Sequence, residues 1–150
     1  MRASTHIIFA LLLSILFLSI YKNFNPIIFI IITLTFSILP DIDYDKSKIG
    51  NNSLSWLLYH LFGHRQLIHS MLIPIMLFFM FFKFSITIAF AILLGYTSHL
   101  ALDSLNKSGL KPLFPLKLHI KGHIKTNSIV EKMIFIILLI ALLYLLLNPF

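Results

Sequence analysis

Five stretches of apolar residues that carry almost no charge constrain the fold of this chain more than any other feature. They cover roughly residues 7–21, 26–39, 68–82, 84–102 and 129–147. A helix needs about 20 apolar residues, within a range of about 17–25, to cross the hydrocarbon core of a bilayer. The run 26–39 is the shortest, so it either thins the bilayer locally or forms only part of a span. With 59% hydrophobic and 11% charged residues and a mean hydropathy of +0.96, the chain is expected to be an all-α membrane protein of about five transmembrane helices, in a single domain over residues 1–150.

Two connections between these runs are long enough to form structure of their own. In the first, residues 53–62 begin with Ser53 as an N-cap and include Trp56 and Tyr59. This segment is too short to span a bilayer, so we expect an interfacial helix that lies along the headgroups. In the second, apolar and polar residues alternate over 116–124, which is compatible with a short β-hairpin.

The basic residues are distributed unevenly between the two sides of the membrane. The chain has 12 Lys and Arg against 5 Asp and Glu, and if its N-terminus is cytoplasmic only Lys22 and Lys83 lie outside. This asymmetry predicts a multi-pass protein of the cytoplasmic (inner) membrane with its N-terminus inside. Attraction to anionic headgroups explains the basic excess, and no nucleic-acid partner is expected. Arg2 before the first run also fits a signal peptide, but no small-x-small cleavage site follows Ile20, so we expect a retained helix.

The other ionisable residues gather at the ends of the apolar runs that this topology places at the cytoplasmic face. They are His6 at the first run, Asp41 and Asp43 after the second, His64, Arg65 and His69 at the third, His99 and Asp103 at the fourth, and Glu131 in the fifth. Charged groups in or near a bilayer need partners. The sequence therefore predicts one polar site at which all five helix ends converge.

His99 and Asp103 form the sharpest local motif. Residues i and i+4 lie on one face of a helix, so the imidazole and the carboxylate can point at one ion. The alternative is an ordinary surface His–Asp pair. Gly95, one turn earlier, allows a neighbouring helix to approach closely.

Two further motifs are weaker by spacing alone. His64 and His69 lie five residues apart across a loop-to-helix junction, where an amphipathic interfacial histidine is the alternative. Pro40 takes the chain off its helical path, and alternation in an extended turn would point Asp41 and Asp43 to one side, although an acidic cap explains them equally. The remaining histidines are assigned outside the site: His60, His119 and His123.

Taken together, these motifs resemble a known family. In chain order they are Thr5-His6, Leu39-Pro40-Asp41-Ile42-Asp43, Gly63-His64-Arg65, His69-Ser70, Gly95-Tyr96, Ser98-His99 with Asp103, and Gly109 through Pro115. The chain thereby resembles, from residue 5 to about residue 131, the YdjM family of membrane-bound metal-dependent hydrolases. That family is more remotely similar to the zinc-dependent phospholipase C and single-strand nuclease group. Two positions depart from the pattern: Tyr44 stands where His is common, and Ile68 where Thr is common.

The resemblance implies two sets of site residues. The implied metal ligands are His6, Asp41, Asp43, His64, His69, His99 and Asp103. The implied catalytic residues are Asp41, Asp43, Arg65, Ser70 and Glu131. Glu131 joins them because Ser128 and Glu131 look like the Ser-x-x-Glu that opens the last helix in the family.

Imidazole and carboxylate ligands, in a chain without cysteine, suit zinc, with manganese or iron as alternatives. One catalytic zinc takes about three protein ligands, so this many candidates favours two or three ions. Paired ions can activate water and clamp the oxygens of a phosphoester. The expected function is therefore phosphoester hydrolysis by metal-activated water, with a lipid substrate favoured by a site at headgroup depth. Arg65 would stabilise phosphoryl charge, and Asp41 or Asp43 would bridge ions or accept the proton.

Two other functions remain open from the sequence. A metal-ion or solute transporter would also place His and Asp in helices, but it needs polar groups near mid-membrane, and residues 71–82 and 133–147 offer almost none. A non-catalytic membrane scaffold could keep a metal for stability alone. Structural and catalytic ligands are the same residue types, so the sequence does not separate these two roles.

Overall fold

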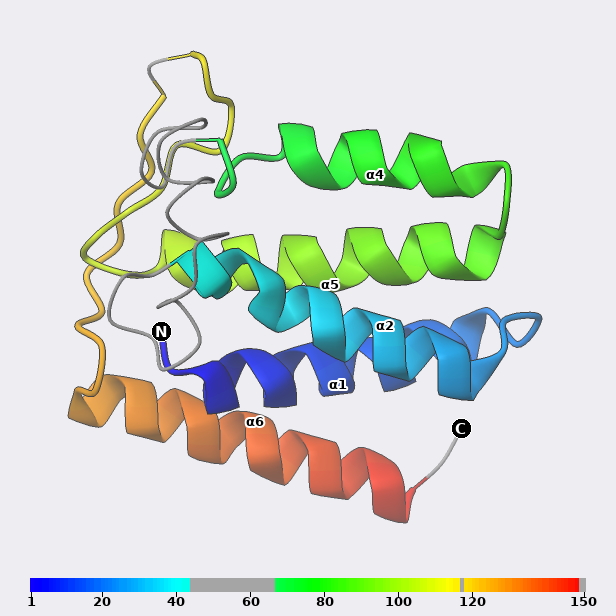
Figure 1. Ribbon diagram of the computed structural model, residues 1–150. Coiled ribbons are helices and arrows are strands. Elements are labelled where there is room, and N and C mark those ends of the chain that lie inside the picture. The colour runs from blue at the N-terminus through cyan, green and yellow to red at the C-terminus, as the bar shows by residue number, and fades with distance from the viewer. Residues whose placement is uncertain (44–66, 117, 149–150) are drawn as a thin grey trace.

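The computed structural model describes residues 1–43, 67–116 and 118–148, with residues 42 and 43 as backbone only. This part of the chain forms α1 (Ala3–Ile20), α2 (Pro26–Ile38), the 3₁₀ helix η1 (Leu39–Asp43), α4 (Leu72–Phe82), α5 (Ile86–Ser104) and α6 (Ile129–Leu147). Successive helices alternate in direction, so the starts of α1, α4 and α6 meet the ends of α2 and α5 at one end of the bundle (Figure 1). The prediction of an all-α membrane protein is confirmed.

Three of the five α-helices are long enough to cross a bilayer. They are α1, α5 and α6, with 18, 19 and 19 residues, or about 27–29 Å at about 1.5 Å per residue. The apolar helices α2 and α4 have only 13 and 11 residues. The short second run therefore gives a short helix, as expected, whereas the third run gives a shorter helix than predicted.

Helix α5 lies at the centre of the bundle and packs against α1, α2 and α4, whereas α6 packs against α1 alone among the described helices. Burial follows this arrangement: 56% of the 18-residue apolar stretch of α5 is buried, but only 11% of the corresponding stretch of α6. The uncovered face of α6 is apolar, as a lipid-facing helix requires. Residues carried by α5 are therefore the ones best shielded from lipid and water.

Local hydrogen bonds explain where the helices begin. The side chains of Asn25 and Ser85 accept from Ile28 N and Ile88 N, so they cap α2 and α5. The third apolar run was expected to be helical from residue 68, but α4 begins at Leu72. The chain before it forms a turn instead, in which Met71 N donates to the carbonyl of Pro112 at 2.7 Å.

Two predicted loop structures are wrong. Residues Leu39–Asp43 continue α2 as a 3₁₀ helix, so the expected strand-like alternation of the acidic residues does not occur. The hairpin expected over 116–124 does not form in the described residues. Its backbone pairs with the segment after α5 instead, through Ile124 N to Leu105 O at 3.0 Å and the bridge between Leu110 and Ile120. The predicted interfacial helix 53–62 lies outside the described residues.

Gly95 is the point of closest approach between α2 and α5. A Cβ built at Gly95 would collide with the backbone carbonyl of Thr33. We therefore expect Gly95→Ala to destabilise the protein by about 1–3 kcal/mol through overpacking, measured as a lower melting temperature in detergent. Ala101→Leu adds bulk at an exposed position of the same helix and serves as control. An unchanged melting temperature in Gly95→Ala would contradict the close approach.

Candidate metal centre

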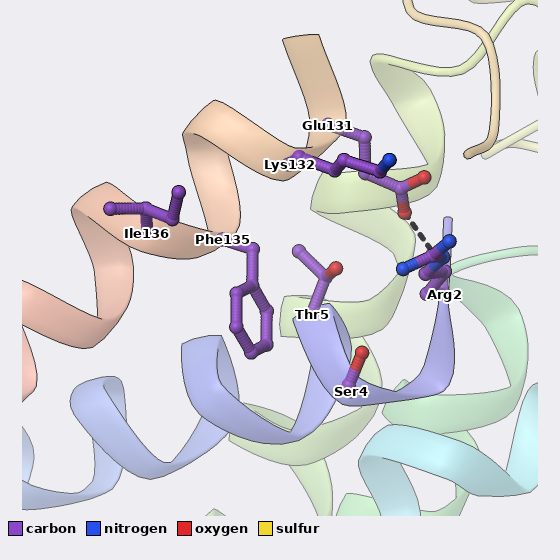
Figure 2. Close-up of a pocket in the computed structure, with 7 residues that line it drawn as sticks. All are labelled: Arg2, Ser4, Thr5, Glu131, Lys132, Phe135 and Ile136. Carbon is purple, nitrogen blue, oxygen red and sulfur yellow. Dashed lines mark hydrogen bonds between the residues drawn. The ribbon is translucent and has the colours of Figure 1, made fainter. Parts of the chain in front are cut away.

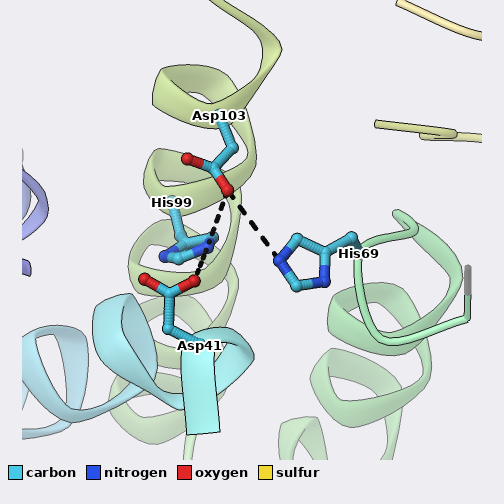
Figure 3. A group of neighbouring side chains, drawn as sticks. All are labelled: Asp41, His69, His99 and Asp103. Atoms are coloured by element: carbon cyan, nitrogen blue, oxygen red, sulfur yellow. Dashed lines mark ion pairs between the residues drawn. The ribbon is translucent and has the colours of Figure 1, made fainter. Parts of the chain in front are cut away.

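Four side chains from three segments converge at the end of the bundle where α2 and α5 finish. Asp41 comes from η1, His69 from the turn before α4, and His99 and Asp103 from the last turns of α5 (Figure 3). One ligand atom from each lies within 4.8 Å of the others. Donors held about 2.1 Å from a tetrahedral zinc lie about 3.4 Å apart, so small side-chain movements bring this set into coordination.

Asp103 is the residue that the others share. Its Oδ2 lies 3.5 Å from His99 Nε2 and 3.8 Å from His69 Nε2. Its Oδ1 lies 3.4 Å from His6 Nε2 and 2.8 Å from the amino group of Met1. Each oxygen of the carboxylate therefore has its own set of partners: imidazoles at Oδ2, and an imidazole and an ammonium group at Oδ1. A carboxylate that bridges two cations has the same arrangement.

The ring of His99 is held in one orientation by the backbone. Its Nδ1 lies 2.8 Å from the carbonyl oxygen of Ser37, which can only accept, so Nδ1 carries the proton and donates. The Nε2 lone pair then points between Asp41 Oδ1, at 3.7 Å, and Asp103. A backbone carbonyl that fixes the tautomer in this way is typical of metal-binding histidines.

His6 completes the group from the α1 side. Its ring stacks on that of His99 with centroids 4.1 Å apart, and it is 1% exposed. Within the described part of the chain neither ring nitrogen of His6 has a hydrogen-bond partner, and neither does His99 Nε2. Buried polar atoms without partners are costly, and divalent ions would satisfy His99 Nε2 and one ring nitrogen of His6, since each neutral imidazole offers one lone pair. The residues present therefore fit a metal.

The other predicted site residues are placed differently. Ser70 is fully buried, but its hydroxyl donates to Leu67 O at 2.7 Å, which closes the turn that carries His69. Asp43 is the last residue of η1, two residues after Asp41, which belongs to the cluster. Two candidates, His64 and Arg65, lie outside the described residues.

Glu131 is not brought into the four-residue cluster. Its carboxylate accepts from the backbone N–H of Arg2 (Figure 2). It also accepts from the N–H of Asn127, and its own N–H donates to the Ser128 hydroxyl. The Ser128 side chain caps α6 as in a capping box, but the Glu131 carboxylate accepts from Asn127, one residue before the N-cap, and from Arg2 at the start of α1. The geometry therefore gives Glu131 a positioning role: it joins the first turns of α1 and α6.

We expect Glu131→Ala to lower the free energy of unfolding by about 1.5–3 kcal/mol, because buried N–H groups lose a charged acceptor. The amount of metal bound per chain should stay at the wild-type value, since Glu131 is not a ligand in this arrangement. Thermal unfolding and elemental analysis of the detergent-purified protein check the two parts. Loss of metal from a variant that still folds would return Glu131 to the site.

Some contributions to the site carry no signal in the sequence. The carbonyl of Ser37 orients His99, yet every residue has a carbonyl. The Tyr96 hydroxyl donates to Ile68 O at 2.6 Å and so holds the turn before His69. Tyr96 belongs to the Gly95-Tyr96 pair of the family resemblance, but nothing in the sequence indicates that its hydroxyl bonds to the turn before His69.

The fold and the cluster together define a membrane protein with a buried group of Asp and His residues able to hold a divalent metal. The chain matches the YdjM inner membrane protein family over residues 1–150, and it belongs to that family. It is also 31% identical over 130 residues to the uncharacterized protein YvsG of Bacillus subtilis (strain 168), an alignment that covers 83% of this chain and 81% of YvsG. No solved structure matches.

Proposed function

We propose that this protein is a membrane-bound metal-dependent hydrolase that cleaves a phosphoester at the cytoplasmic face of the membrane. The observation that carries the proposal is the shared carboxylate of Asp103, with His69 and His99 facing one oxygen and His6 facing the other. The position next to Oδ1 is taken by the amino group of Met1 in this structure, and a second ion would replace it there. Two cation positions on either side of one carboxylate match the pairs of ions that hydrolyse phosphoesters. Zinc is the expected metal, with manganese or iron as alternatives, because the donors mix imidazole and carboxylate.

The residues of the cluster divide into buried holders and one open side. The side chains of His6 and His99 are fully buried, whereas that of Asp41 is 35% exposed. Substrate and water therefore reach the cluster from the side of Asp41. A divalent ion bound here would supply Lewis acidity toward a phosphoryl oxygen and toward a water molecule.

Asp41 is suited to accept the proton from the attacking water. Its carboxylate Oδ1 lies 3.7 Å from His99 Nε2, and its side chain is the most exposed of those in the cluster, at 35%. Asp103 holds the imidazoles together from the opposite, more buried side, where its side chain is 15% exposed. Asp43, two residues after Asp41 in the sequence, is proposed to assist with proton transfer, and Arg65, four residues before His69, to stabilise phosphoryl charge.

Transport is less well supported by the polar groups inside the bundle. The buried hydroxyls of Ser14, Thr33 and Ser98 each donate to a helix carbonyl, at 2.7–3.3 Å. These hydroxyls are few, and among the described residues the bundle interior away from the end that carries the cluster holds no buried charged side chain of the kind that marks a transport path. The polar cluster lies at one end of the bundle, which favours chemistry at a membrane surface.

A direct test uses the detergent-purified chain with zinc, a chromogenic phosphodiester and a phospholipid substrate. We expect metal-dependent turnover that Asp41→Asn lowers by about 10²–10⁴-fold, the usual contribution of general acid–base catalysis. His123→Ala, which changes an exposed histidine outside the cluster, should leave turnover unchanged. Metal bound at the wild-type level without turnover on any phosphoester would instead support a metal-stabilised scaffold.

A further inference from the structure

A cavity lies between the first turns of α1 and α6, apart from the metal cluster. It has a volume of about 240 Å³ and is lined by Arg2, Ser4, Thr5, Glu131, Lys132, Phe135 and Ile136 (Figure 2). We propose that this cavity binds the phosphate group of a membrane phospholipid. This inference goes beyond hydrolysis and concerns a ligand held beside the catalytic cluster.

The polar lining is suited to a phosphate. Arg2 and Lys132 bring two positive charges, against the single carboxylate of Glu131. Both oxygens of that carboxylate already accept from backbone N–H groups, those of Arg2 and Asn127. Arg2 also donates from Nη2 to Asn127 Oδ1, but this uses only part of its fork of N–H donors. The rest of the guanidinium and the Lys132 ammonium can face an anion, and arginine in particular suits the oxygens of a phosphate.

Thr5 provides an independent indication of a ligand. Its side chain is 1% exposed, and its hydroxyl has no hydrogen-bond partner in the described part of the chain. Figure 2 shows this hydroxyl on the Arg2 side of the cavity. The first turn of α1 also has no acidic residue and no side-chain cap, so its positive end is not neutralised from within α1. A phosphate oxygen would give the buried hydroxyl the partner that it lacks.

The apolar lining indicates a lipid as the source of the phosphate. Phe135 and Ile136 lie one turn further along α6, on a helix whose uncovered face is apolar. A phospholipid places its phosphate at the level of the helix ends and its acyl chains along such a face. Free phosphate would gain nothing from Phe135, so the two sources can be separated by experiment.

The test measures binding to the full-length, detergent-purified protein by native mass spectrometry and by competition with a fluorescent lipid. Phosphatidylglycerol should bind, diacylglycerol with the same acyl chains should not, and inorganic phosphate should compete at least about tenfold more weakly. Lys132→Gln, which changes an exposed side chain and should fold normally, is expected to weaken phosphatidylglycerol binding by about fivefold, and Arg2→Gln with Lys132→Gln by about tenfold or more. Thr5→Val and Phe135→Ala should weaken it as well.

A matched control removes two exposed cations from the other end of the bundle, in Lys22→Gln with Lys83→Gln. Equal loss of binding in this control would mean general attraction to a basic protein and would overturn the proposal. Inorganic phosphate that competes as well as the lipid, with no effect of Phe135→Ala, would also overturn it. Each readout is binding and not turnover, so its failure is distinct from failure of the proposed hydrolase activity.

Discussion

Asp103→Asn is expected to reduce the zinc bound by this protein to the background level. Asp103 is the residue that His6, His69 and His99 all face, at 3.4–3.8 Å. An amide keeps the size of the side chain but removes the negative charge and one of the two acceptor oxygens. Loss of an outer-shell partner alone costs about 10–100-fold in metal affinity, so loss of a shared ligand should cost at least about a hundredfold. Elemental analysis after gel filtration, with a competition titration, measures the effect.

The matched control for this experiment is His123→Ala. It removes an exposed imidazole outside the cluster and should leave the metal content unchanged. Circular dichroism of Asp103→Asn should show the wild-type helix content, because the amide can still hydrogen-bond in the same space. A folded Asp103→Asn protein that keeps its zinc would mean that the ion binds somewhere other than this cluster.

The membrane fold could be predicted because bilayer insertion depends on apolar length, which is visible in the sequence. The boundaries of the last helix, 129–147, agree with the structure at both ends. The 3₁₀ helix at Leu39–Asp43 is a local departure from the prediction, whereas long-range pairing decided the other two departures. The turn before α4 exists because Met71 bonds to Pro112, and the segment around Ile124 pairs with Leu105. No local propensity encodes such partners.

The cluster could be anticipated for a related reason. Because successive helices alternate in direction, the end of one helix and the start of the next lie at the same face. The sequence alone therefore predicts that His6, Asp41, His99 and Asp103 lie together. Which oxygen of Asp103 faces which imidazole, and the stacking of His6 on His99, depend on side-chain packing and could not be predicted. Glu131 shares the same end of the bundle, yet its geometry as a helix cap takes it out of the cluster. Position at a common face is therefore a necessary condition for a ligand and not a sufficient one.

Removal of the metal should destabilise the whole bundle. The four-residue cluster joins η1, α5 and the turn before α4, and His6 stacks on it from α1. An ion held by Asp41, His69 and Asp103 therefore links segments from most of the described chain. A ligand that binds only the folded state at about a thousand times its Kd adds about 4 kcal/mol to the free energy of unfolding. Chelation should therefore lower the melting temperature in detergent, and zinc should restore it. Magnesium should not, because it prefers ligand sets made only of oxygen.

The same Asp103→Asn variant distinguishes this effect from a general action of the chelator. Without the shared carboxylate, the melting temperature should be lower from the start and should no longer respond to zinc or to chelation. His99 Nε2 and one ring nitrogen of His6 are buried without hydrogen bonds, and they are the atoms that lose a partner when the metal leaves. A wild-type protein whose melting temperature ignores both zinc and chelator would show that these atoms are tolerated without an ion, and the metal centre would then have no energetic basis.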